Sequence, residues 1–168
     1  MSEIILSQHD LDLIRREGEA HFPDECCGFL FGISPPTSVG GQGGSEDRTR
    51  EINEVIPIHN EQGTNRARRF LISPEEFRKA EAHARETNQE LLGFYHTHPD
   101  HPAIPSEYDR EHALPFYSYV ILSVRNGRAA ELRSWTLGVD RTAYTEENVT
   151  ILVGTALSCR PDNVEIAE

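Results

Sequence analysis

An apolar segment that ends in two histidines constrains the fold of this chain more than any other feature. Residues 91–98 read Leu-Leu-Gly-Phe-Tyr-His-Thr-His, and Pro99 follows directly. A continuous apolar run of this length is typical of a strand that is buried on both faces, as at the centre of a sheet. Because proline cannot donate a hydrogen bond to a neighbouring strand, the strand is expected to end there. The sequence therefore predicts a central strand that carries His96 and His98 at its carboxyl end.

Six further segments have the composition of strands, and a tight turn joins two of them. The expected strands cover residues 26–33, 52–58, 70–72, 117–124, 130–137 and 149–153. The first of them is apolar with two glycines, the pattern of a buried strand. Asn126 and Gly127 stand between the fourth and the fifth, and this dipeptide is typical of a β-hairpin.

Three serines mark the beginnings of helices. Each is followed three residues later by an acidic residue, the spacing of a capping box that satisfies the free N–H groups of a first turn. The helices are expected to begin after Ser7, Ser73 and Ser106 and to end near Ala20, Thr87 and Pro115. Helices mixed with crossover-linked and hairpin-linked strands predict a mixed α/β (α+β) fold, with a central sheet packed by helices.

The length of 168 residues fits a single domain with one core. We expect that domain to cover residues 1–155 and to be followed by a polar tail at 156–168. Residues 34–50 carry two prolines and four closely spaced glycines with almost nothing to bury, and are expected to form a flexible loop within the domain.

The charge of the chain excludes several classes of partner. A formal net charge of -12 and a pI near 5.1 argue against a general nucleic-acid binder and against binding to an anionic membrane surface. No apolar run approaches the roughly 18 residues of a membrane helix. The first residues lack the basic and apolar regions of a signal peptide, and the three cysteines show no disulfide framework, so we expect a cytosolic protein. Oligomeric state leaves no signal in the sequence.

The chemistry of the chain is concentrated where the central strand ends. His96 and His98 are two residues apart, so both imidazoles point to the same side of a strand. Asp109 lies in the first turn of the next helix and can supply a third ligand. Two imidazoles and one carboxylate suit zinc and leave a fourth position for water, whose pKa zinc lowers towards about 7. A hydrolase of this kind also needs a base, and Glu25 is the best candidate.

The same residues carry a resemblance to a known family. Residues 96–109 contain the pattern His-x-His-x7-Ser-x2-Asp, with proline directly after the second histidine, and residues 23–30 read Pro-x-Glu-x-Cys-Gly-Phe-Leu. Together they resemble the JAMM metalloproteases, the catalytic branch of the MPN domain family. The resemblance extends from about residue 4 to residue 153, with 34–50 outside it. The absence of long insertions makes the small prokaryotic branch the closer match.

The resemblance implies a cytidine-deaminase-like fold and one zinc ion held by His96, His98 and Asp109. It implies that Glu25 acts as general acid and base, and that Ser106 stabilises the oxyanion of the tetrahedral intermediate. It also implies cleavage of a peptide, isopeptide or peptide-like amide bond at the C-terminus of a ubiquitin-like protein. For the small prokaryotic members, that partner is often a sulfur carrier with a flexible tail.

Other interpretations stay open at this point. Relatives of this fold include metal-free protein-binding scaffolds, and a zinc hydrolase of small amides or short peptides would need the same residues. Ser106 is also expected merely as a helix cap, and Glu25 as a solvated acid in a loop. Cys26 and Cys27 are interpreted as core residues, since cysteine is often buried as a small apolar group. His101 is equally compatible with substrate contact and with a solvated loop.

Overall fold

The computed structural model describes residues 2–34, 48–58 and 72–154. These ranges contain the strands β1 (Glu3–Ser7), β2 (Cys27–Ile33), β3 (Thr49–Ile58), β4 (Glu90–Pro99), β5 (Ser118–Arg125), β6 (Arg128–Leu137) and β7 (Tyr144–Leu152), and the helices α1 (Gln8–His21), α2 (Pro74–Glu86) and α3 (Glu107–His112). None of these helices combines the length and the apolar character that a membrane span requires.

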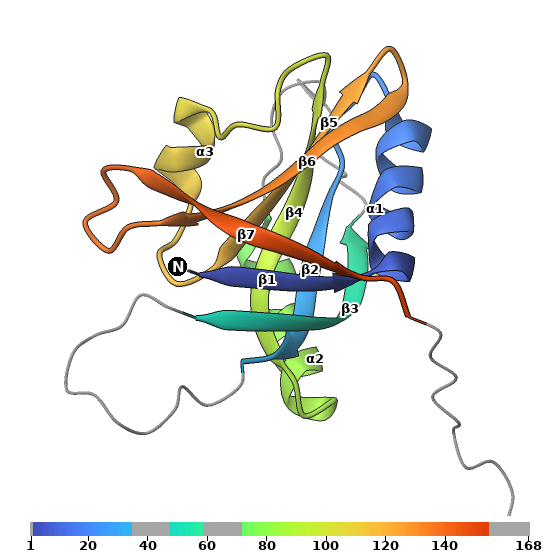
Figure 1. The fold of residues 1–168 in the computed structure, drawn as a ribbon. Helices are drawn as coiled ribbons and strands as arrows, with labels where there is room; N and C mark the ends of the chain where they lie inside the picture. Colours follow the sequence, from blue (N-terminus) through green and yellow to red (C-terminus); the bar gives the residue numbers. More distant parts are fainter. Residues whose placement is uncertain (1, 35–47, 59–71, 155–168) are drawn as a thin grey trace, which may run out of the picture.

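The strands form one mixed sheet that curls until its two ends meet. The strand order is β1-β3-β2-β4-β5-β6-β7, and a parallel pairing of β1 with β7 closes it into a barrel (Figure 1). At its middle, β4 runs antiparallel to β2 and parallel to β5. The predicted mixed α/β fold with a central sheet and packing helices is therefore confirmed, and the closure is an addition to it.

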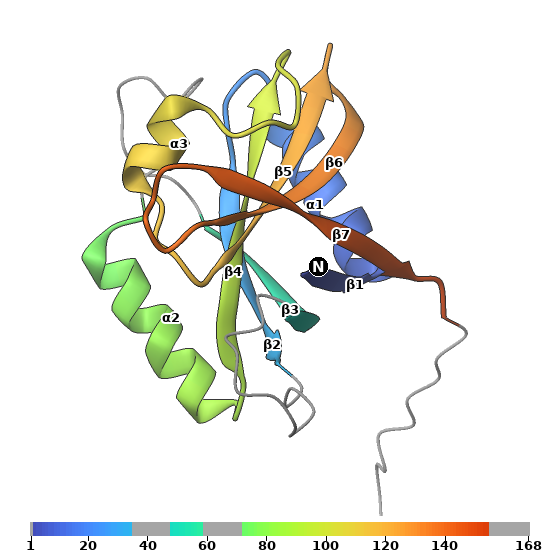
Figure 2. The ribbon, with the colours of Figure 1, turned by 60° about the vertical axis from the view of Figure 1, so that its left-hand side comes forward.

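Both faces of β4 are buried, which explains its continuous apolar sequence. Tyr95 belongs to a core cluster that includes Ile14 of α1, whereas Phe94 belongs to a second cluster that includes Ala80 and Ala84 of α2. Figure 2 shows α1 and α2 on opposite sides of this strand. Side chains alternate along a strand, so His96 and His98 share the face of Phe94.

The three serine signals mark helix N-termini as predicted. Ser7, Ser73 and Ser106 each occupy the N-cap, and each hydroxyl accepts a hydrogen bond from the backbone N–H three residues later. The hairpin at Asn126 and Gly127 also forms, between β5 and β6. These signals are local, so neighbouring residues are sufficient to determine them.

Where the structure departs from the sequence analysis, the cause is pairing between distant strands. β1 was not expected, and β7 begins at Tyr144 rather than at residue 149. The expected loop 34–50 was too long, because Thr49 and Arg50 pair with β1 and belong to β3. In the expected strand 70–72, Ile72 is not in a strand. Residues 35–47, 70, 71 and 155–168 lie outside the described ranges, so the remaining loop and the tail stay predictions.

A buried ion pair joins two strands that are distant in the sequence. Arg50 of β3 lies 3.3 Å from Glu147 of β7, and both side chains are almost completely buried. Ser134 of β6 donates a second hydrogen bond to Glu147, at 2.6 Å. Arg50 also donates to the Phe116 carbonyl, 2.9 Å away in the segment that leads from α3 to β5. This network explains why charged residues can stand at strand positions that lack an apolar pattern.

Candidate metal centre

Two buried imidazoles face each other at the carboxyl end of β4. His96 is 1% exposed and His98 is 7% exposed. Their Nε2 atoms are 3.0 Å apart, as expected for residues two positions apart on one face of a strand. β2 and β5 pair with β4 on either side at His96, so the strand end is held within the sheet.

Asp109 completes the cluster from the first turn of α3. Its Oδ1 is 3.5 Å from His96 Nε2, and its Oδ2 is 3.4 Å from His98 Nε2. The loop between β4 and α3 is held against the sheet, because Trp135 donates to the Ala103 carbonyl at 3.0 Å. The side chains that the sequence analysis grouped as metal ligands are thus brought together in space.

A backbone carbonyl determines which nitrogen of His98 faces the cluster. His98 Nδ1 is 2.8 Å from the Pro102 carbonyl oxygen, which can only accept a hydrogen bond. Nδ1 therefore carries the proton, and when the ring is neutral its Nε2 presents a lone pair to Asp109 and His96. Metal-bound histidines are commonly oriented by such a bond on the other ring nitrogen.

The electrostatics of the cluster favour the cation-binding protonation states of His96 and Asp109 but not that of His98. Burial lowers the pKa of His96, and this outweighs the opposing effect of Asp109. Burial alone would raise the pKa of Asp109, but the hydrogen bonds from His96 and His98 outweigh it and hold the pKa far below its ordinary value. Burial opposes protonation of His98 too, yet the bonds to Asp109 and Pro102 and the charge of Glu25 raise its pKa. A cation that binds here therefore competes with the proton of His98.

The facing nitrogen and oxygen atoms of the cluster lie at separations close to those in a zinc site. Tetrahedral zinc with bonds of about 2.1 Å places neighbouring ligand atoms about 3.4 Å apart. The two imidazole Nε2 atoms are 3.0 Å apart, His96 Nε2 is 3.5 Å from Oδ1 of Asp109, and His98 Nε2 is 3.4 Å from Oδ2 of the same carboxylate. Within the described residues these side chains form a group able to hold a metal ion. Two imidazoles and one carboxylate are also the chemistry of a zinc site that leaves one position open.

Glu25 reaches the same edge of the sheet from the beginning of β2. Cys26 and Thr97 exchange two hydrogen bonds, from the Cys26 N–H to Thr97 Oγ1 at 2.9 Å and from the Thr97 N–H to the Cys26 carbonyl at 3.0 Å. Since Cys27 pairs with His96, this register continued by two residues places Glu25 opposite His98. Its charge also contributes to the raised pKa of His98.

Ser106 is the cap of α3 and a hydrogen-bond partner of Asp109. Its hydroxyl accepts from the Asp109 N–H at 3.1 Å and donates to Asp109 Oδ2 at 2.7 Å, and its own N–H donates to the same oxygen at 2.6 Å. The capping box therefore also orients the carboxylate that faces the histidines. The single hydroxyl proton of Ser106 is directed at Asp109 in this arrangement.

Cys26 and Cys27 lie in the core, and His101 lies in the loop after β4. Burial raises the pKa of Cys26 to about 11 and that of Cys27 to about 12. Both thiols are buried and stay protonated near neutrality, which agrees with their interpretation as core residues. His101 is exposed in the loop, where its carbonyl accepts a 2.6 Å hydrogen bond from Ser123.

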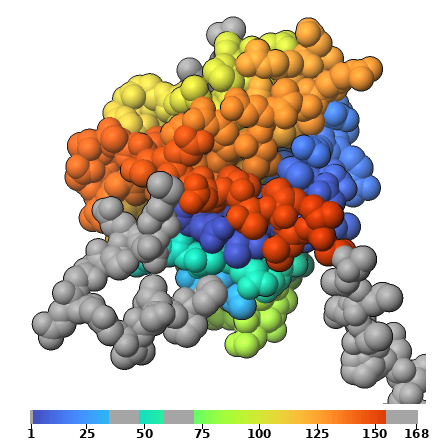
Figure 3. All heavy atoms as spheres, viewed as in Figure 1, coloured from blue at the N-terminus to red at the C-terminus, as the bar shows by residue number. Residues whose placement is uncertain are grey.

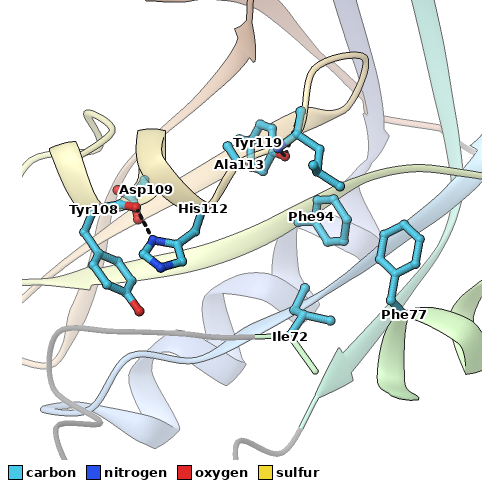
Figure 4. Close-up of a pocket in the computed structure, with 9 residues that line it drawn as sticks. Ile72, Phe77, Phe94, Tyr108, Asp109, His112, Ala113 and Tyr119 are labelled. Carbon is cyan, nitrogen blue, oxygen red and sulfur yellow. Dashed lines mark hydrogen bonds between the residues drawn. The ribbon is translucent and has the colours of Figure 1, made fainter. Parts of the chain in front are cut away.

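An apolar pocket of about 230 Å³ opens beside Asp109 (Figure 4). It lies between α2 and the segment around α3, and its lining residues are Ile72, Phe77, Phe94, Tyr108, Asp109, His112, Ala113, Leu114 and Tyr119. This pocket was not predicted from the sequence. One signal was available, because Phe94 stands two residues before His96 and therefore on the same face of β4.

Comparison with known proteins places this chain in a family. The model of the family Prok-JAB, described as prokaryotic homologs of the JAB domain, matches residues 7–138. Desampylase from Haloferax volcanii is 31% identical over 90 residues, which are 53% of this chain and 64% of that protein. The match thus spans less than two thirds of the length of this curated relative.

Two solved structures have similar folds over nearly their whole length. A protein from Desulfitobacterium hafniense superposes with a TM-score of 0.68 and 25% identity, covering 89% of this chain and 92% of that one. A protein from Salinibacter ruber superposes with a TM-score of 0.61 and 34% identity, covering 90% and 94%. The family match and these folds confirm the resemblance inferred from the His-x-His-x7-Ser-x2-Asp pattern. The chain belongs to the prokaryotic branch of the JAB (MPN) domain family.

Proposed function

We propose that this protein is a zinc-dependent hydrolase that cleaves an amide bond at the C-terminus of a ubiquitin-like protein. The observation that carries the proposal is the convergence of two imidazole nitrogens and the carboxylate of Asp109 in one group that could hold a metal ion, the ligand chemistry of a catalytic zinc site. The similarity to a desampylase supports a ubiquitin-like modifier as the substrate. The reaction is proposed to take place in the cytosol, as expected from the sequence.

The proposed reaction adds one water molecule across a peptide, isopeptide or peptide-like bond. Glu25 accepts a proton as the water oxygen attacks the carbonyl carbon, and it delivers a proton to the leaving nitrogen as the carbon–nitrogen bond breaks. Bound zinc would supply a Lewis acid that acidifies water and polarises the carbonyl. His96, His98 and Asp109 would hold the ion, and the Pro102 carbonyl would keep His98 in the tautomer that binds it.

The substrate segment in this proposal is an extended, flexible tail, such as that of a sulfur-carrier protein. Tails of this kind commonly bind by adding a strand to the edge of a sheet. The pocket beside Asp109 offers an apolar surface next to the reacting bond. The leaving group, whether a peptide, a lysine side chain or cysteine, would occupy the opposite side of the carbonyl.

Metal analysis combined with a turnover assay tests the proposed function. We expect about one zinc per chain and hydrolysis of a tailed sulfur carrier that stops with a chelator and resumes when zinc is added back. Protein that takes up no zinc even after incubation with it would support the metal-free scaffold instead. Faster turnover of free short peptides than of the tailed protein would favour a peptidase or small-amide hydrolase.

Ser106→Ala is expected to weaken zinc binding by about 10-fold, because Asp109 loses the hydroxyl that orients its carboxylate. Ser73→Ala is the matched control, since it removes the same type of capping box from α2, far in sequence from the ligands. Zinc affinity is measured by competition with a chromophoric chelator. If Ser106 acts only on the oxyanion, zinc affinity will stay unchanged while kcat falls, since the hydroxyl must turn away from Asp109 to serve there.

A further inference from the structure

The helix that supplies Asp109 is too small to hold its own position. α3 has six residues, and none of them is buried as a whole. Isolated helices shorter than about 12 residues are marginal in water, and most helical stability in proteins comes from tertiary packing. The separation between Asp109 and the two histidines must therefore be maintained by contacts from other elements.

The turn between β6 and β7 makes such contacts in both directions. Arg110 of α3 donates from Nη1 to the Arg141 carbonyl at 2.8 Å, and Arg141 donates from Nη2 to the Glu111 carbonyl at 3.1 Å. Each arginine thus binds the backbone of the other element. Figures 1 and 2 both show this turn lying against α3, and in the space-filling view of Figure 3 its dark-orange atoms lie beside the yellow atoms of α3.

Hydrogen bonds within the β6–β7 turn hold its own conformation. Arg141 has a φ of 58°, a left-handed conformation that is uncommon outside glycine and that requires support from its surroundings. Its N–H donates to the Gly138 carbonyl at 2.8 Å, and the Gly138 N–H donates to the Ala143 carbonyl at 3.1 Å. Asp140 accepts from the N–H and the hydroxyl of Thr142, at 3.1 and 2.9 Å.

A buried tyrosine anchors the residues that follow α3. Tyr119 of β5 is 5% exposed. Its hydroxyl accepts from the Leu114 N–H at 2.7 Å and donates to the Leu114 carbonyl at 2.9 Å. Leu114 follows α3 by two residues, so this pair of bonds anchors the exit of the helix to the sheet.

We propose that Arg141 and Tyr119 are positioning residues for the metal site, which hold α3 so that Asp109 meets His96 and His98. This inference rests on the proposed function, because it assumes that the three side chains bind zinc. It adds two residues, from β5 and from the β6–β7 turn, that act on α3 rather than on the ion, and Tyr119 also lines the apolar pocket beside Asp109.

Replacing Arg141 should change zinc affinity in opposite directions if the residue acts through its charge or through its contacts with α3, and this makes the proposal testable. Arg141 donates to the Glu111 carbonyl, which is two residues after Asp109 in the same short helix. Arg141 is therefore a cation in the surroundings of a cation site. Removing its charge alone would strengthen zinc binding, while releasing α3 would weaken it.

The test measures zinc affinity of Arg141→Ala and Tyr119→Phe by competition with a chromophoric chelator. We expect affinity to fall about 10-fold in the first variant and several-fold in the second, as for other residues that orient metal ligands. Arg15→Ala on α1 removes the same charge far from α3 in the sequence and is expected to leave zinc affinity unchanged. Tyr119→Phe keeps the ring and the packed volume. If Arg141→Ala folds poorly, Tyr119→Phe therefore still shows whether loss of a contact to this segment weakens zinc binding.

A spectroscopic measurement separates positioning from a general loss of stability. With cobalt(II) in place of zinc, the visible absorption bands report the ligand geometry. We expect these bands to shift in Arg141→Ala and Tyr119→Phe but not in Arg15→Ala. Equal or tighter zinc binding with unchanged cobalt spectra in both variants would overturn the inference while leaving the proposed function intact. If wild-type protein binds no zinc, the proposed function itself fails.

Discussion

Asp109→Ala is expected to abolish stoichiometric zinc binding and to reduce amide hydrolysis by about 1000-fold or more, since the ion supplies several kcal/mol of transition-state stabilisation. Asp109 is the only carboxylate among the three converging donors, and its ionised form faces both imidazoles. Without it, only two neutral imidazoles remain, whereas a catalytic zinc site has three protein ligands.

Two further variants make this result interpretable. Asp12→Ala removes an exposed acidic residue of α1 and is expected to retain about one zinc per chain and full turnover. Asp109→Asn preserves the shape of the side chain but not its charge, so it tests whether the effect depends on the anionic ligand rather than on the cap of α3. Zinc content is measured after gel filtration, beside turnover. One equivalent of zinc in Asp109→Ala would show that the ligand set is wrong.

Glu25→Gln is expected to keep zinc and to lose most of the activity. Glutamine has the size of glutamate but cannot accept a proton from water or return one to the leaving nitrogen, a role worth about 100- to 10,000-fold in rate. The β2–β4 register, continued by two residues, puts Glu25 opposite His98, and Glu25 is not one of the three converging residues, so zinc affinity should change little. The measurement is kcat beside zinc content.

Asp24→Asn is the matched control for this variant. It removes one negative charge at the adjacent position, where the backbone N–H donates to the His21 carbonyl, and it should leave kcat within about twofold. Loss of zinc from Glu25→Gln would instead make Glu25 a ligand or a structural residue. Undiminished turnover with zinc present would mean that another group accepts the proton.

The two predictions together distinguish binding of the metal from its use. Asp109 should govern both zinc content and turnover, whereas Glu25 should govern turnover alone. A scaffold protein would show neither dependence, because it has no turnover to lose. The pair therefore tests the proposed function from two independent side chains on different elements, α3 and the entrance of β2.

Several elements were predictable because their causes lie within a few residues. Residues 91–98 read as a central strand, and the structure buries β4 on both faces. Ser106 read as a helix start because the cap and the acid three residues later satisfy each other locally. The spacing of His96 and His98 placed both rings on one face for the same reason.

Other features have causes that the local sequence does not contain. β1 pairs with both β3 and β7, and these pairings close the barrel. β7 begins with Tyr144, Thr145 and Glu146, which show no apolar alternation, and pairing with β6 is what makes the segment a strand. Such strands are stabilised by partners far away in the chain, so their own composition predicts them poorly.

The features of the metal site also fall into a group determined by the local sequence and a group determined by tertiary packing. The sequence by itself determined the strand end with two histidines, the capped helix start with Asp109 and, through the family pattern, the set of candidate residues. Only the tertiary structure decided the distances among them, the tautomer of His98 set by the Pro102 carbonyl, and the support of α3 by Tyr119 and Arg141. The reason is physical: residue spacing determines which way neighbouring side chains point, whereas separations between elements depend on packing and hydrogen bonds that form once the sheet has closed.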